Sequence, residues 1–196
     1  MLILASKSAT RKALLTGAGL RFESSPAPID ERTIENAVLG KSPESVARTL
    51  AEAKALSVSV AQPGAMVIGA DQVLAFGDAL LHKPADLAEA AAQLKALRGR
   101  SHHLHAGVAL ARGGAVLWSD VATARLTLRA FSDDDLAAVL AAEGEGLLEA
   151  VGAYRLEGAS IQLFEAVEGD YFTILGLPLL PLLAALRRLA PGERFT

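Results

Sequence analysis

The sequence predicts an α/β protein with a mixed β-sheet, and three observations support this class. Segments with helical periodicity alternate along the chain with short apolar segments that are typical of strands. Several strand segments are joined by tight turns, which indicates hairpins and therefore a sheet that is not purely parallel. The 196 residues suffice for one domain with a real core, or for two small lobes that share one sheet.

The N-terminal segment predicts two strands around a helix. The apolar run LILA at residues 2–5 indicates a short buried strand. The polar turn at residues 6–8 leads into a helix at residues 9–15, which ends near Gly17. A second strand is expected at residues 21–25.

A loop and a long helix follow. Two prolines predict a loop across residues 26–32, which includes an acidic turn. Ser42 is a good N-cap, Pro43 suits the first helical position, and Glu44 suits the positive end of the helix dipole. We therefore expect a helix from Pro43 to about Ser59.

The middle of the chain predicts a strand, a hairpin and a helix. A buried strand at residues 66–70 carries Asp71 at its C-terminal end. Residues 73–76 and 79–82 indicate a hairpin around a Gly-Asp turn. Asp86 is a typical N-cap for the helix that follows and ends at an Arg-Gly pair.

The last part of the chain predicts two hairpins and two helices. Residues 104–111 and 116–130 indicate a hairpin, and Ser132 with three following aspartates predicts a helix. Residues 161–166 and 171–175 indicate another hairpin. An apolar C-terminal helix is expected to be buried, since it is interrupted by prolines and arginines and is shorter than the roughly 20 residues that span a bilayer.

Composition excludes several classes of protein. The net charge is −3 and no basic block occurs, which argues against a duplex nucleic acid partner. Because there are no cysteines, a disulfide framework and a cysteine nucleophile are impossible, and a reducing cytoplasm is expected. The first apolar run is too short for a signal peptide, so no membrane partner is expected.

The first candidate site is the turn from Ser6 to Arg11 between a strand and a helix. A helix N-terminus offers free backbone N–H groups to phosphate, Ser6 and Ser8 add hydroxyl groups, and Arg11 adds a forked cation. From spacing alone, a capped surface helix with a solvated arginine is the more common arrangement.

The second candidate is Asp71, which lies between two apolar runs. A strand that delivers an acid to its C-terminal end can place a metal ligand or a general base there. The alternative is a solvated aspartate in a turn. A charge between buried runs needs a reason, and this favours the functional interpretation.

Four lone charges and a histidine cluster complete the candidates. The charges are Glu31, Lys54, Lys83 and Glu157, and their spacing does not show whether they converge. The segment Ser-His-His-Leu-His at residues 101–105 has no acid at ligand spacing, so a histidine-metal hydrolase is kept only as an alternative.

Together these segments resemble the Maf family of nucleotide pyrophosphatases over nearly the whole chain. The opening LILASKSATRKALL resembles the family signature Leu-Ala-Ser-x-Ser-x-x-Arg-x-x-Leu-Leu. Thr10, His82 and Arg98 depart from the common pattern, in which an arginine, a glycine and a serine stand. The other matching segments are Ile29-Asp30-Glu31, Ala51-Glu52-Ala53-Lys54-Ala55, Gly69-Ala70-Asp71-Gln72-Val73, His82-Lys83-Pro84, and residues 97–102, 152–158 and 175–179.

The resemblance implies a mixed α/β fold with an elongated central sheet and two lobes around a cleft, similar to inosine-triphosphate pyrophosphatases. It implies a single domain across residues 1–196, a cytoplasmic location, and often a homodimer. It also implies hydrolysis of nucleoside triphosphates to monophosphate and pyrophosphate with Mg²⁺ or Mn²⁺.

The resemblance also implies a role for each candidate residue. Asp71 would activate water or bind the metal, and Glu31 would help to hold the metal. Glu157 would lie near the base, and Gln72 would contact the substrate. The residues that would neutralise or bind the triphosphate are Lys54, Lys83, Arg11, Ser6 and Ser8.

The preferred base and two alternative functions are left open. Gln72, Glu157 and residues 163–165 resemble the branch of the family associated with 7-methyl-GTP. A preference for dTTP or UTP is an alternative. A protein that binds nucleotides without hydrolysing them, and regulates septum formation, is another.

Overall fold

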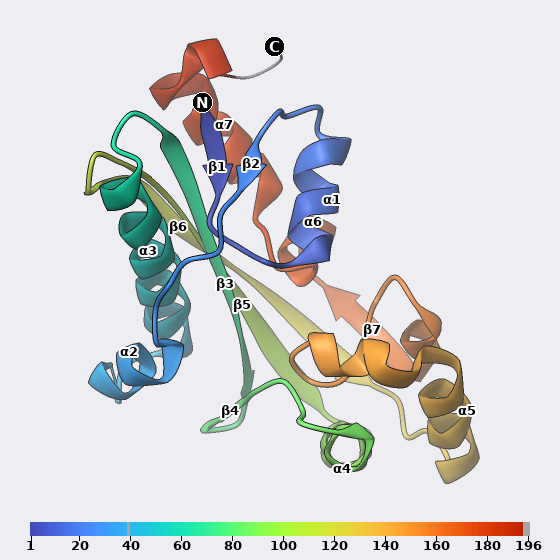
Figure 1. Cartoon of the computed structure of the whole chain (residues 1–196). Helices are drawn as coiled ribbons and strands as arrows, with labels where there is room; N and C mark the ends of the chain where they lie inside the picture. The colour runs from blue at the N-terminus through green and yellow to red at the C-terminus, as the bar shows by residue number, and fades with distance from the viewer. Residues whose placement is uncertain (39, 194–196) are drawn as a thin grey trace. The chain divides into compact units, whose positions relative to one another are not determined.

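A seven-stranded mixed sheet organises the part of the chain that the structure describes, residues 1–38 and 40–193 of a computed structural model. The strands follow the order β2-β1-β3-β5-β6-β7, and β4 pairs with β3 (Figure 1). The chain divides into two compact units. Unit 1 contains Met1–Gln72, His105–Ala122 and the chain from Asp170 onward, and unit 2 contains Val73–Leu104 and Thr123–Gly169.

Unit 1 is built around parallel strands. Strand β1 (Leu2–Leu4) pairs in parallel with β2 (Glu23–Ser24) and with β3 (Met66–Phe76). The hairpin strands β5 (Ser101–Arg112) and β6 (Ala115–Leu128) contribute to both units. The helices of unit 1 are α1 (Ala9–Gly17), α2 (Glu31–Ala37), α3 (Pro43–Ala61), α6 (Tyr171–Ile174), α7 (Leu179–Leu189) and the 3₁₀ turn η3 (Pro191–Glu193).

Unit 2 is built from antiparallel pairs. The last residues of β3 pair with β4 (Ala79–Leu81), and β6 pairs with β7 (Phe164–Glu168). The helices of unit 2 are α4 (Leu87–Leu97), α5 (Asp133–Glu143), and the 3₁₀ turns η1 (Gly144–Glu149) and η2 (Ala159–Leu163). The predicted mixed α/β class is therefore confirmed, while the expected single domain and the cleft between lobes stay predictions.

Local capping chemistry explains why several helices begin where the sequence predicts. The side chains of Ser42, Asp86 and Ser132 each accept a hydrogen bond from a backbone N–H in the first turn of α3, α4 and α5, respectively. Ser132 and Asp135 form a complete capping box.

Two predicted elements are wrong for a related reason. Asp30 does not lie in a loop that continues through residue 32, because its carboxylate accepts the N–H of Thr33 and starts α2. Residues 171–175 do not form a strand, because Asp170 accepts the N–H and hydroxyl of Thr173 and starts α6. In both cases an Asp that resembles a turn residue is an N-cap.

The predicted break after residue 70 is also wrong. Strand β3 continues without interruption to Phe76, so Asp71 lies in its middle rather than at its end. Its partner β1 ends at Leu4, which pairs with Ile68. Asp71 is consequently three residues past the end of the neighbouring parallel strand, which leaves its position open to the turn that follows β1.

The sheet in unit 1 is covered on both faces. Even-numbered residues of β1 and β3, such as Leu4 and Ile68, pack in one apolar cluster with α1 and α7. Odd-numbered residues, such as Ile3 and Val67, pack in another cluster with α3. Asp71 belongs to the odd-numbered set of β3, so its side chain faces α3.

At two glycines, Gly69 and Gly107, the strands approach the backbone of helix α3 directly. A Cβ atom on Gly69 would lie 2.1 Å from the carbonyl oxygen of Ala51, and one on Gly107 would lie 2.3 Å from that of Ala47. Ala51 and Ala47 are fully buried. A residue larger than glycine at either strand position would meet the backbone of α3.

None of the described helices combines the length and the apolar composition that a membrane-spanning segment requires.

Replacement of Gly69 by alanine is expected to force α3 away from the sheet, because the new methyl group would meet helix backbone rather than a flexible side chain. We expect the free energy of unfolding to fall by about 2 kcal/mol or more, which is the usual cost of overpacking a tightly packed core. Chemical denaturation measures it. Gly64→Ala is the control, since a Cβ there meets nothing within 4 Å. Equal stabilities of the two variants would contradict the close packing.

Candidate active site

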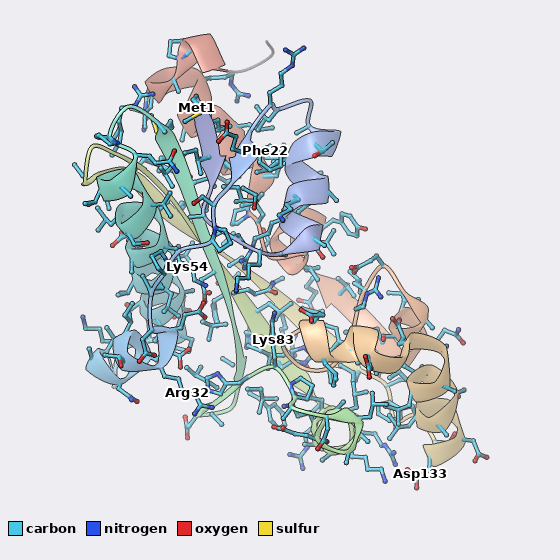
Figure 2. The ribbon with its side chains drawn as sticks, viewed as in Figure 1. Met1, Phe22, Arg32, Lys54, Lys83 and Asp133 are labelled. Atoms are coloured by element: carbon cyan, nitrogen blue, oxygen red, sulfur yellow. The ribbon has the colours of Figure 1, made fainter. Side chains whose placement is uncertain are left out.

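The centre of the candidate site is an ion-pair cluster that joins three elements of unit 1. Lys54 extends from α3 (Figure 2), and its Nζ lies 2.6 Å from Oδ1 of Asp71 on β3. The same Nζ lies 2.8 Å from Oε1 of Glu31, the first residue of α2. The structure therefore brings together three residues that the sequence leaves 17 to 40 positions apart.

Burial sets the electrostatics of this cluster. Asp71 is 7% and Lys54 is 8% exposed, whereas about half of the Glu31 side chain is exposed. Burial raises the pKa of the Asp71 carboxyl, and Lys54 and Arg11 offset only part of this rise. Asp71 is thus a carboxylate of increased basicity, because water is largely excluded from it.

The turn after β1 supplies hydroxyl groups and a cation beside this cluster. The hydroxyl of Ser8 accepts the backbone N–H of Arg11 at 3.3 Å and caps α1. The hydroxyl of Ser6 accepts the N–H of Ser8 and, at 3.4 Å, Nη1 of Arg11. Burial lowers the pKa of Arg11, and the charges of Asp71 and Glu31 act in the opposite direction. The charge of Arg11 thus acts on Asp71, whereas the phosphate contacts expected of Ser6, Ser8 and Arg11 stay predictions.

A segment near the C-terminus holds Arg11 and Gln72. Arg11 Nε donates to the carbonyl oxygen of Gly176 at 2.8 Å. The amide nitrogen of Gln72 donates to the carbonyls of Thr173 and Ile174 at 3.1 and 2.9 Å. Gly176 has a φ of +89°, which favours glycine at this turn. The observed contacts of the Gln72 amide are with these two backbone carbonyls. Its expected contact with substrate stays a prediction.

The backbone carbonyls of this segment were not among the predicted site residues. A glycine directly after a short apolar segment indicates a turn, and the resemblance of residues 175–179 to a family segment is the other signal that the sequence gives. No residue type in that segment indicates which carbonyl would accept a hydrogen bond from Arg11.

Lys83 and Glu157 belong to unit 2, and their convergence on the triphosphate stays a prediction. Lys83 is largely exposed, and its Nζ lies 3.8 Å from Oε2 of Glu149. A pair this exposed contributes little to stability, so Lys83 is available for another partner. Glu157 Oε1 lies 3.8 Å from Nε of Arg155.

The loop that carries Glu157 is held by buried polar groups. Glu143, with 4% of its side chain exposed, lies 3.5 Å from Nη1 of Arg155 and accepts the N–H and hydroxyl of Ser160. A Cβ on Gly158 would lie 2.1 Å from Oε1 of Glu143. The loop is thereby fixed on both sides of Glu157, and Glu143 was not recognised from the sequence.

The three clustered histidines have separate environments. His102 is buried in unit 2, and its Nε2 lies 2.7 Å from the hydroxyl of Tyr154. Burial lowers the pKa of His102 to about 4, so it is neutral at neutral pH. His105 belongs to unit 1, and its Nδ1 lies 3.5 Å from Glu44. His103 is exposed. The contacts of His102 with Tyr154 and of His105 with Glu44 are typical of structural histidines.

The donor atoms of the cluster fit a hard divalent cation. Within residues 1–38 and 40–193, no group of three or more His, Cys, Asp or Glu side chains is placed so that it could hold a metal ion. Glu31 and Asp71 offer two carboxylates. Mg²⁺ typically binds one or two carboxylates and takes its remaining ligands from water and substrate phosphates. Two acids beside the turn that follows β1 match that requirement.

The arrangement defines the class of site. A buried carboxylate, a second carboxylate, a lysine, an arginine and a capped helix N-terminus suit a polyphosphate with a divalent cation. A family model described as Maf-like protein matches residues 1–189. The chain belongs to this family.

Several relatives match almost end to end. A protein of Rhizobium etli named 7-methyl-GTP pyrophosphatase is 52% identical over 190 residues, which are 96% of each chain. A protein of Brucella abortus with the same name is 50% identical over 95% of each chain. A nucleoside triphosphate pyrophosphatase of Bradyrhizobium diazoefficiens is 53% identical over 95% of this chain and 92% of that protein.

Among solved structures, a HAM1 protein from Coxiella burnetii aligns with 66% of this chain and 73% of its own. The TM-score is 0.44 and the sequence identity is 16%. This similarity is too low to support a conclusion about either fold or function.

Removal of the Lys54 charge is expected to destabilise the protein in a manner that depends on pH. Lys54→Met leaves ionised Asp71 without its main counter-charge, so the pKa of Asp71 rises further. Loss of one partner of a buried pair costs about 3 kcal/mol at neutral pH. The loss should shrink as the pH falls through the raised pKa of Asp71, because a protonated carboxyl no longer needs the ammonium group.

Denaturant titrations of Lys54→Met and wild type between about pH 8 and pH 4 measure this effect. Lys41→Met, at an exposed lysine, is the matched control and should follow wild type. A stability difference that does not change with pH would mean that the Lys54 side chain stabilises the fold by packing alone.

Proposed function

We propose that this protein hydrolyses nucleoside triphosphates to nucleoside monophosphate and pyrophosphate. The observation that carries the proposal is buried Asp71 beside Lys54, Glu31 and Arg11. The names of the relatives, nucleoside triphosphate pyrophosphatase and 7-methyl-GTP pyrophosphatase, support the same reaction.

Asp71 is the proposed general base. In hydrolysis at the α-phosphorus, a water molecule attacks, its proton passes to a carboxylate, and pyrophosphate leaves. A base is effective when its pKa lies near the working pH, and burial shifts Asp71 in that direction. A protein that only senses nucleotides would need the cations but not this basic carboxylate, so the geometry favours the catalytic function over the regulatory alternative.

The cations and hydroxyl groups of unit 1 are the proposed phosphate ligands. Lys54 and Arg11 would offset charge that develops on the leaving pyrophosphate, and the free N–H groups at the start of α1 would donate to phosphate oxygens. Ser6 and Ser8 would add hydroxyl donors. We assign Lys83 the same role from unit 2.

Glu31 and Asp71 are the proposed ligands of Mg²⁺ or Mn²⁺. When bound there, the metal would supply charge neutralisation on the phosphate oxygens.

Glu157 is the proposed determinant of base preference, with 7-methyl-GTP as the favoured substrate. N7-methylation makes guanine cationic, and a carboxylate attracts that cation more strongly than a neutral amide does. A carboxylate can also accept the N1–H and the exocyclic amine of guanine together. Two of the relatives above carry the corresponding name, which supports this choice over dTTP or UTP.

We also propose a cytoplasmic location and a homodimer, with a place in the control of septum formation. The absence of cysteine from all 196 residues fits a reducing compartment. The dimer and the link to septum formation rest on the family alone.

Asp71→Asn is expected to retain nucleotide binding and to lose turnover by at least about 10²-fold, because the amide has the same size but cannot accept a proton. Phosphorus NMR of the products should show pyrophosphate for wild type and no orthophosphate. Asp78→Asn, in the exposed turn between β3 and β4, is the control. Near-normal turnover by Asp71→Asn would refute the assigned role, and orthophosphate release would place the attack on another phosphorus.

Glu157→Gln is expected to lower kcat/KM for 7-methyl-GTP about tenfold or more and to lower that for GTP by less, since both bases share the N1–H and amine contacts but only the methylated base is cationic. A steady-state panel of 7-methyl-GTP, GTP, dTTP and UTP measures this ranking, and Glu145→Gln, an exposed acid of the same unit, is the control. Wild-type preference for dTTP or UTP, or an unchanged ranking in the variant, would remove Glu157 from base selection.

A further inference from the structure

Lys54 lies where the two proposed metal ligands face each other. Its Nζ is 2.6 Å from Oδ1 of Asp71 and 2.8 Å from Oε1 of Glu31. A Mg²⁺ ion bound by both carboxylates would need to approach each oxygen to about 2.1 Å. Because the ammonium group contacts one oxygen of each carboxylate, Oδ1 of Asp71 and Oε1 of Glu31, a metal ion between these two oxygens would have to displace Lys54.

The charges of the ion-pair cluster balance one another. The two carboxylates are opposed by Lys54 and by Arg11, whose charge also acts on both acids. Since Lys54 is only 8% exposed, little water screens it from an approaching divalent ion. Mg²⁺ also gives up its water reluctantly. Metal ions without nucleotide should therefore bind to this site with low affinity while Lys54 remains between Asp71 and Glu31.

A triphosphate changes this balance. Its oxygens supply both new metal ligands and a new partner for an ammonium group. The backbone of α3 at Lys54 is fixed by the contact of Ala51 and Ala55 with Gly69. The four-carbon stem of lysine is flexible, however, so the ammonium group can move while the helix stays in place.

We propose that Lys54 is a resident cation that the metal displaces only when the triphosphate arrives. In the free protein its ammonium group holds Asp71 and Glu31 together. On binding of the metal–triphosphate complex, Asp71 and Glu31 would hold the metal, and the Lys54 ammonium group would move to the phosphate oxygens. The consequence is ordered use of the site: the metal enters with the nucleotide rather than before it. This inference rests on the proposed function, and on Glu31 and Asp71 as metal ligands.

The test is a Mn²⁺ titration of the purified protein followed by electron paramagnetic resonance, without nucleotide. Wild type should bind Mn²⁺ weakly, and Lys54→Met should bind it at least about tenfold more tightly, since the competing charge is gone. Addition of a triphosphate with a non-hydrolysable α,β-methylene bridge should tighten Mn²⁺ binding strongly in wild type and much less in the variant. Lys41→Met should behave as wild type in both titrations.

A second variant and a separate activity assay make the result interpretable. Lys54→Gln replaces Lys54→Met if the latter does not fold, as judged by circular dichroism, and the same tightening is expected. Mn²⁺ binding by Lys54→Met that is equal to or weaker than that of wild type would overturn the inference. Pyrophosphate release by wild type is measured separately, so that absence of turnover would refute the proposed function without affecting the result of the Mn²⁺ titration.

Discussion

The close contact of α3 with the sheet is the constraint on which the candidate site depends. Gly69 lies two residues before Asp71 on the same face of β3, and Lys54 lies between Ala51 and Ala55, whose backbone and methyl groups surround that glycine. Because no side chain separates helix from strand, Lys54 reaches Asp71 directly rather than through water. A wider spacing would leave a buried carboxylate and a buried ammonium group unpaired, which is far more costly than the loss of packing alone.

This contact also explains how a charge can occupy the middle of a buried strand. Asp71 interrupts an otherwise apolar run in β3, and its neighbours in the strand cannot compensate for its charge. Compensation comes from α3 through Lys54 and from α1 through Arg11. The pKa of Asp71 stays raised because the effect of burial outweighs that of these two cations.

The parts of the fold that sequence predicts well are those fixed by local chemistry. Ser42, Asp86 and Ser132 start helices because each satisfies the N–H groups of the residues that directly follow it. Asp30 and Asp170 do the same, but proline or glycine beside them made a turn the more obvious interpretation.

The candidate site was predicted in its residue types but not in its geometry. The sequence marks both Asp71 and Lys54 as candidates, but it predicts Asp71 at a strand end, because no local pattern shows that Lys54 contacts it. Lys83 and Glu157 show the same limit of sequence-based prediction. The segments around them resemble family segments, but no local pattern predicts which residues or ligands their side chains contact.

The hydrogen bond between Arg11 and Gly176 has a consequence for a chain that is still being synthesised. These partners are 165 positions apart, and Gln72 is joined to the same segment across 101 and 102 positions. A growing chain emerges from its N-terminal end, so Ser6, Lys54 and Asp71 are present long before the carbonyl that holds the arginine. The hydrogen bond that fixes Arg11 therefore forms among the last events of biosynthesis. A chain that ends before Gly176 contains Glu31 and Asp71 but lacks the carbonyl group that holds Arg11.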